Sequence, residues 1–104
     1  MDIIIQSLGF KASDNLDGFV REKLSKLDHM SHKIIRADVT LFEESTASEN
    51  NYCEIRLEVP GNDHFVKKHG SSFEQAVADT VDALQNTLRK AKEKMIDRRQ
   101  AKDV

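Results

Sequence analysis

The sequence is poor in the residues that build disulfide scaffolds, cofactor loops and membrane spans. Its 104 residues include one cysteine, one proline, four glycines and no tryptophan. A single cysteine excludes an internal disulfide and is typical of a reducing compartment. No apolar run approaches the roughly 20 residues that span a bilayer, and the N-terminal stretch MDIIIQSLGF lacks the basic region and cleavage site of a secretory signal. We therefore expect a cytoplasmic protein without a membrane partner.

Motifs for enzymatic chemistry are also missing. The sequence contains no CxxC, HExxH, GxSxG or glycine-rich phosphate loop. His64 and His69 are five residues apart in an expected strand, which places them on opposite faces. Cys53 alternates with Ile55 and Leu57, and a free cysteine in such a pattern is usually a core residue. We predict that the protein is not an enzyme and holds no metal or cofactor.

Short stretches that are rich in β-branched residues, or that alternate apolar and polar residues, predict four strands. Pro60–Asp63 has the composition of a turn, and the polar stretch between Glu43 and Asn51 is expected to be an exposed loop. The predicted strands are Asp2–Ser7, Ile34–Glu43, Cys53–Val59 and His64–Gly70.

Apolar residues at helical spacing predict two helices. The first runs from Asp14 to His29 with Ser13 as its N-cap, and the second begins after Ser71 or Ser72 and extends to about residue 96. Because the strands alternate as if one face were buried, we predict an α+β fold of order β-α-β-β-β-α, with two helices on one face of a four-stranded sheet. The first two strands should be parallel and the last three a meander. Residues 1–96 then form one domain, and residues 97–104 form a basic, flexible tail.

Charge is unevenly distributed along the chain. The formal net charge is −2, yet residues 89–104 hold seven Lys and Arg against three acids, a local charge of +4 that leaves −6 for residues 1–88. Such asymmetry predicts a polyanionic partner, although solvated helix ends also carry lysines. If the helices lie side by side, their cations can merge into one strip that binds a nucleic-acid backbone. The candidate residues are Arg21, Lys23, Lys26, Lys67, Lys68, Arg89, Lys90, Lys92 and Lys94.

Four stretches, in this order, resemble the ribosome hibernation-promoting factor family, also called ribosome-associated inhibitor or ribosomal subunit interface protein and formerly sigma-54 modulation protein. They are IQSLGF, REKLSKLDH, the turn VPG and the helix AVADTVDALQNTLRKAKEK. The resemblance implies a fold similar to a double-stranded RNA-binding domain. It also implies a short form, because longer members carry an additional dimerisation domain.

The function that this resemblance implies is translational inhibition without catalysis. Such proteins occupy the mRNA and tRNA channel of the small ribosomal subunit and hold idle ribosomes inactive, with basic residues of both helices against 16S rRNA. The chain departs from the family at Glu74, Ala83 and Asn86, where many members have an aromatic residue or further cations. The matching rRNA-binding positions are Arg21, Lys23, Lys26, Arg89, Lys90, Lys92 and Lys94.

Some alternatives remain open at the level of sequence. The acidic body could serve as a protein-interaction module that modulates a sigma factor, or the chain could bind any double-stranded RNA. Within the first interpretation, ribosomes could end as inactive monomers or as pairs, and a short form would need a second factor to pair them.

Overall fold

The computed structural model describes residues 1–30, 33–44 and 50–102, with side chains described as far as residue 92. The predicted loop between Glu43 and Asn51 therefore falls largely outside the described residues. The element order is the predicted β-α-β-β-β-α. The elements are β1 (Asp2–Ser7), α1 (Asp14–Asp28), β2 (Arg36–Glu43), β3 (Asn51–Val59), β4 (Asn62–Gly70) and α2 (Phe73–Lys102).

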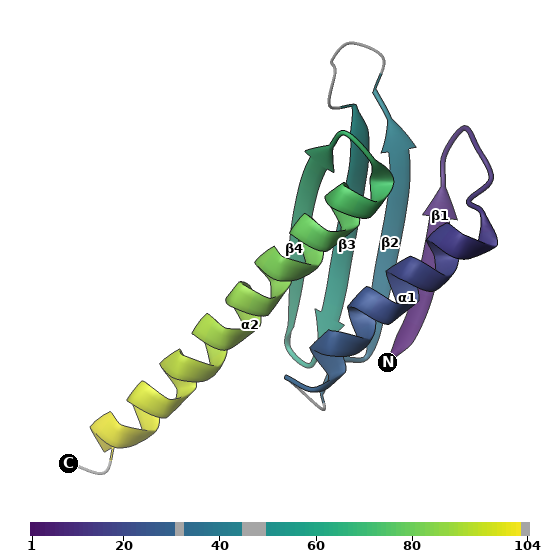
Figure 1. The fold of residues 1–104 in the computed structure, drawn as a ribbon. Coiled ribbons are helices and arrows are strands. Elements are labelled where there is room, and N and C mark those ends of the chain that lie inside the picture. The colour runs from purple at the N-terminus through teal and green to yellow at the C-terminus, as the bar shows by residue number, and fades with distance from the viewer. Residues whose placement is uncertain (31–32, 45–49, 103–104) are drawn as a thin grey trace.

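The strands form one sheet in the order β1-β2-β3-β4 (Figure 1). β1 is parallel to β2, with Ile3 opposite Ala37. β2, β3 and β4 are antiparallel neighbours, so the predicted parallel pair and the predicted meander are both confirmed. Figure 1 shows both helices on the same face of the sheet. This arrangement leaves the opposite sheet face without a helical layer.

Each helix begins at a capping serine. The Ser13 Oγ accepts a hydrogen bond of 3.1 Å from the Leu16 backbone N–H, which satisfies one of the free donors at the start of α1. Of the two predicted caps for α2, Ser72 is the one whose Oγ accepts from the Gln75 N–H, also at 3.1 Å. Both helix starts are thus set by local sequence.

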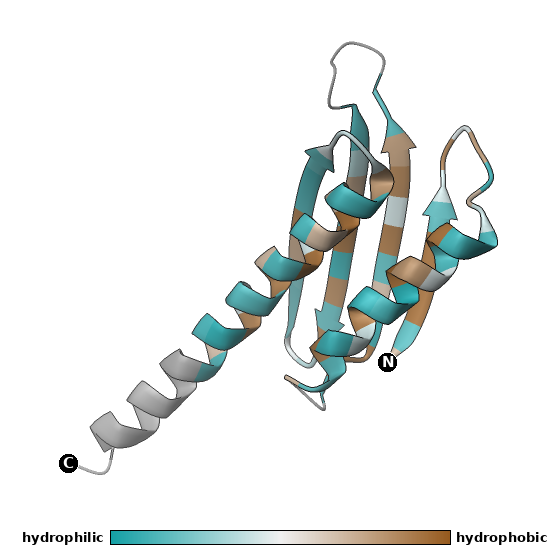
Figure 2. Ribbon diagram, viewed as in Figure 1, coloured by the Kyte–Doolittle hydropathy of each residue, from teal (hydrophilic) through white to brown (hydrophobic). Residues whose placement is uncertain are grey.

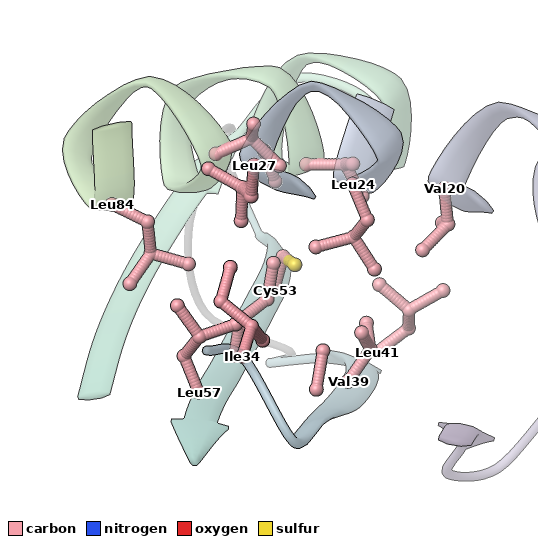
Figure 3. Packing of buried hydrophobic residues seen from close by; sticks show 14 of the residues in the cluster. Val20, Leu24, Leu27, Ile34, Val39, Leu41, Cys53, Leu57 and Leu84 are labelled. Carbon is pink, nitrogen blue, oxygen red and sulfur yellow. The ribbon is translucent and has the colours of Figure 1, made fainter. Parts of the chain in front are cut away.

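The core lies between the helices and one face of the sheet, where apolar residues gather (Figures 2 and 3). Alternate strand residues and the apolar stripes of both helices are buried there, and burial of each large side chain contributes roughly 1.5–3 kcal/mol. The core residues are Leu16, Val20, Leu24, Leu27, Ile34, Ala37, Val39, Leu41, Cys53, Ile55, Leu57, Ala76, Val77, Val81, Leu84 and Leu88.

The hairpin between β3 and β4 is tighter than the predicted turn Pro60–Asp63. Val59 pairs with Asn62, so only Pro60 and Gly61 lie between the strands. Gly61 has a φ of 79°, and proline followed by a glycine of positive φ is typical of a type II turn. β4 consequently starts at Asn62, two residues before the prediction.

Helix α2 extends beyond the sheet. Leu88 is the last buried core residue among those whose side chains are described, and the rest of the helix projects past the strands (Figure 1). Its helical backbone continues to Lys102, beyond residue 96, where the sequence interpretation ended the domain. The division of the chain at residue 96 and the flexibility of residues 97–104 stay predictions.

Candidate nucleic-acid interface

The three cations of α1 lie on two sides of the helix. With the buried stripe of Leu16, Val20, Leu24 and Leu27 as reference and 100° per residue, Lys23 and Lys26 fall on one flank and Arg21 on the other. The Arg21 Nε donates to the Asp17 Oδ2 at 2.8 Å, so part of its charge is already neutralised. The Lys23 Nζ lies 5.4 Å from the centre of the Phe19 ring. Lys23 and Lys26 are therefore the better placed pair on this helix.

The cations of α2 surround the helix just beyond its packed part. Arg89, Lys90 and Lys92 are exposed and, at 100° per residue, point in three different directions. The Arg89 Nη1 is 3.5 Å from the Asn86 Oδ1. Both residues are close in sequence to the buried Leu88. Lys94 belongs to the helical part of α2, but its side chain is not among those that the structure describes. This part of α2 can present cations to a partner from several sides.

Both groups of cations lie toward the same end of the molecule. The two helices pack against each other and run in the same direction across the sheet (Figure 1). Leu27 in the last turn of α1 and Leu84 of α2 lie in the same part of the core (Figure 3). The C-terminal turn of α1 thus adjoins the region where α2 leaves the sheet and its cations begin.

The electrostatic character of α2 changes along its length. From Phe73 to Leu88 the helix contains the acids Glu74, Asp79 and Asp82 and no lysine or arginine, whereas cations predominate from Arg89 onward. A polyanion would be repelled by the first half and attracted by the second. The basic region is therefore confined to the helix ends rather than spread over the helical layer.

The predicted cations Lys67 and Lys68 do not share a surface. Strand residues alternate between faces. Val66, which is partly buried against the core, and Lys68 lie on the helix side of β4, whereas Lys67 lies on the other face. The Lys67 Nζ is 3.8 Å from the Glu54 Oε1. It also lies 5.1 Å and 5.5 Å from the ring centres of Tyr52 and Phe42. A surface that includes both helices can include Lys68 but not Lys67.

Sequence reasoning missed a row of rings on the sheet. Phe42 and Tyr52, opposite each other on β2 and β3, stack with ring centres 5.1 Å apart, and His69 of β4 lies 5.3 Å beyond Tyr52. Desolvation and the nearby Glu44 carboxylate raise the pKa of Tyr52. The three rings are far apart in the sequence, so only the strand register reveals the row.

The described residues contain no cluster of three or more histidine, cysteine or acidic side chains that could hold a metal ion. Cys53 is buried, and burial raises the pKa of its thiol to about 12, which keeps it protonated and unreactive. Within the described ranges, neither helix is long and apolar enough to cross a membrane.

Comparison with known proteins identifies the family. Residues 3–96 match the family described as Sigma 54 modulation protein / S30EA ribosomal protein. The chain belongs to this family. It is 33% identical over 84 residues to a ribosome hibernation promotion factor from Deinococcus radiodurans. The matched region covers 79% of this chain and 44% of that protein. The chain thus spans less than half the length of this family member.

Solved structures share the fold. The N-terminal domain of Thermus thermophilus Protein Y superposes with a TM-score of 0.75 at 23% identity, over 86% of this chain and 98% of that domain. A ribosomal subunit interface protein from Coxiella burnetii gives a TM-score of 0.79 at 16% identity, over 89% of this chain and 99% of that one. The α+β fold described above thus matches nearly the whole length of each of these structures.

Proposed function

We propose that this protein binds the small ribosomal subunit in the mRNA and tRNA channel and holds idle ribosomes inactive. Its membership in the S30EA family and its likeness to a protein named ribosome hibernation promotion factor support this proposal. The partner in contact with the protein is 16S rRNA, and binding requires no cofactor or catalysis.

The observation that carries the proposal is the position of the cations. Lys26 in the last turn of α1 and Arg89, Lys90 and Lys92 of α2 are all exposed, near the end of the helical layer. Cations held on folded helices bind phosphates by releasing counterions from the nucleic acid, and little order has to be created on binding. The net negative body adds no long-range attraction to rRNA, so this local patch must supply it.

Two double variants with equal charge change test this interface. Lys90→Ala with Lys92→Ala removes two cations from α2, and Arg56→Ala with Lys67→Ala removes two from the opposite sheet face. Binding to isolated small subunits, large subunits and a generic RNA duplex is measured at several salt concentrations. We expect tight binding to small subunits only, and we expect the α2 variant to lessen the salt slope by up to about 1.8 while the control stays unchanged.

Three other results of this experiment would contradict the proposal. Equal affinity for the generic duplex and the small subunit would make the protein a general double-stranded RNA binder. Failure to bind either subunit would contradict ribosome binding and leave the protein-interaction alternative. If the sheet-face control lost as much affinity as the α2 variant, the proposed orientation would be wrong.

A further inference from the structure

The sheet face opposite the helices, here called the open face, presents a regular grid of side chains. The strand register places residues from β1 to β4 in four rows across the sheet, and neither helix covers them. The rows are Asp2, Arg36, Glu58 and Asp63; Ile4, Asp38, Arg56 and Phe65; Gln6, Thr40, Glu54 and Lys67; and Phe42, Tyr52 and His69.

Negative charge is in excess on the open face. Its four rows hold five carboxylates and three cations, which gives a charge of −2 with His69 neutral. Each cation already has a carboxylate partner: Arg36 lies 3.2 Å from Asp38, Arg56 lies 2.9 Å from Asp63, and Lys67 lies 3.8 Å from Glu54. Incoming phosphates would meet neutralised cations and surplus acids. An incoming cationic group would be attracted instead.

Two large apolar side chains are exposed within this charged grid. Ile4 on β1 is 47% exposed and Phe65 on β4 is 61% exposed, and both belong to the second row. Between them lies a hollow of about 510 Å³ whose lining also includes Arg36, Asp38, Thr40, Glu54 and Arg56. Asp38 and Glu54 are paired with Arg36 and Lys67, so the hollow itself suits an apolar side chain. An ammonium or guanidinium group beside that side chain would be attracted by the carboxylates that are in excess over the whole open face.

The aromatic row is less suited to stacking with nucleobases. The Lys67 Nζ lies over the Phe42 and Tyr52 rings, and these two rings already stack on each other with an interplanar angle of 8°. Single-stranded nucleic-acid sites combine free aromatic faces with a positively charged groove. On the open face, stacking occupies one face of each ring of this pair, and positive charge is not in excess.

We propose that the open face is a docking surface for a protein partner, namely a segment that carries lysine or arginine beside an apolar side chain. Its chemistry is complementary to the face: the cations meet the surplus carboxylates, and the apolar side chain enters the hollow between Ile4 and Phe65. Because this face is opposite the helices, docking does not compete with contacts made by Lys26 or Lys90. The proposal is therefore independent of rRNA binding.

The docking is tested by NMR on the ¹⁵N-labelled chain of 104 residues without ribosomes. The probe is a seven-residue peptide that alternates lysine and leucine. Matched peptides replace lysine by glutamate or leucine by glycine, and a six-residue oligouridylate represents single-stranded RNA. We expect the lysine–leucine peptide to shift the amide signals of Ile4, Asp38, Glu54 and Phe65. The peptide concentration at half-saturation should be at least about tenfold lower than for either control peptide.

Variants make the test specific. Phe65→Ser should weaken peptide binding about tenfold through loss of one apolar contact, and Glu54→Gln should weaken it several-fold. Ile35→Ser is the control, because Ile35 is 49% exposed but lies outside the four rows. Equal binding of the glutamate–leucine peptide, signal shifts outside the open face, or oligouridylate binding on it would each overturn the proposal.

Discussion

Lys67 and Lys68 are neighbours in β4, yet their side chains lie on opposite faces of the sheet. Lys67 is engaged by Glu54 and by two aromatic rings on the open face. Lys68 is exposed on the face that carries the helices, and β4 packs against α2. Of these two neighbouring residues, Lys68 can therefore join the proposed rRNA surface and Lys67 cannot.

Single substitutions should separate these two lysines. We expect Lys68→Ala to lower the affinity for small subunits by about threefold at low salt and to lessen the salt slope, because one phosphate contact is lost. Lys67→Ala should leave the affinity within a factor of two. Both variants change the net charge equally, so each controls for the other in the same titration. Equal losses for both would contradict the assignment of the two faces.

Two glycines should respond oppositely to alanine. Gly61 has a φ of 79° in the β3–β4 turn, and a side chain in this conformation costs roughly 1–2 kcal/mol. Gly18 lies in α1, with nothing within 4 Å of an added Cβ, so alanine there should stabilise the fold by about 1 kcal/mol through helix propensity. Urea unfolding of Gly61→Ala and Gly18→Ala measures both free energies of unfolding. A stabilising Gly61→Ala would contradict the turn geometry.

Cys53 should act as a structural residue. It is fully buried, and Cys53→Ala should lower the free energy of unfolding at pH 7 by about 1 kcal/mol without affecting ribosome binding. Burial raises the thiol pKa from 9.0 to about 12 in the folded protein. Above pH 9 the unfolded thiol ionises while the folded one stays protonated, so the contribution of Cys53 to stability declines as pH rises toward 12.

Urea unfolding at pH 7 and at pH 10 checks this sign. The difference in stability between the natural chain and Cys53→Ala should shrink at the higher pH, since only the natural chain carries the thiol. An unchanged difference would mean that the folded thiol ionises as easily as the unfolded one.

Much of the fold follows from local sequence, whereas the grouping of surface residues does not. Ser13 as a cap, the helical spacing of Leu16 to Leu27 and the alternation around Cys53 all gave the right elements. The start of β4 was wrong by two residues because the pair Pro60–Gly61 closes the turn by itself. The face of Lys67 could have been read from alternation with Val66, yet its partners on β2 and β3 depend on the register.

The aromatic row and the open-face hollow are further groupings of surface residues that local sequence does not predict. Phe42, Tyr52 and His69 come together only when three strands are aligned, and one residue of slip would send each ring to the other face. Ile4 and Phe65 are 61 positions apart in sequence, yet both line one hollow on the four-stranded sheet. Periodicity predicts which residues share a face of one strand, but pairing between strands decides which residues share a site.

The position of cations along α2 should matter more than their number. Arg89, Lys90 and Lys92 lie within four residues of Leu88, which packs in the core and fixes that part of the helix. Arg98, Arg99 and Lys102 are at least ten residues beyond Leu88 and belong to the segment predicted as a tail. Groups near a fixed point lose less conformational freedom on binding a phosphate than groups far from it.

Two triple variants test position at constant charge. Alanine at Arg89, Lys90 and Lys92 should lessen the salt slope for small-subunit binding by about 2 to 3, while alanine at Arg98, Arg99 and Lys102 should lessen it by less than about 1. A chain that ends at Ile96 should unfold within about 0.5 kcal/mol of the full chain if the division at residue 96 is right, because a surface change away from the core has little effect on stability. Equal slopes for the two triple variants would show that only net charge matters, and that anchoring by Leu88 contributes nothing to recognition.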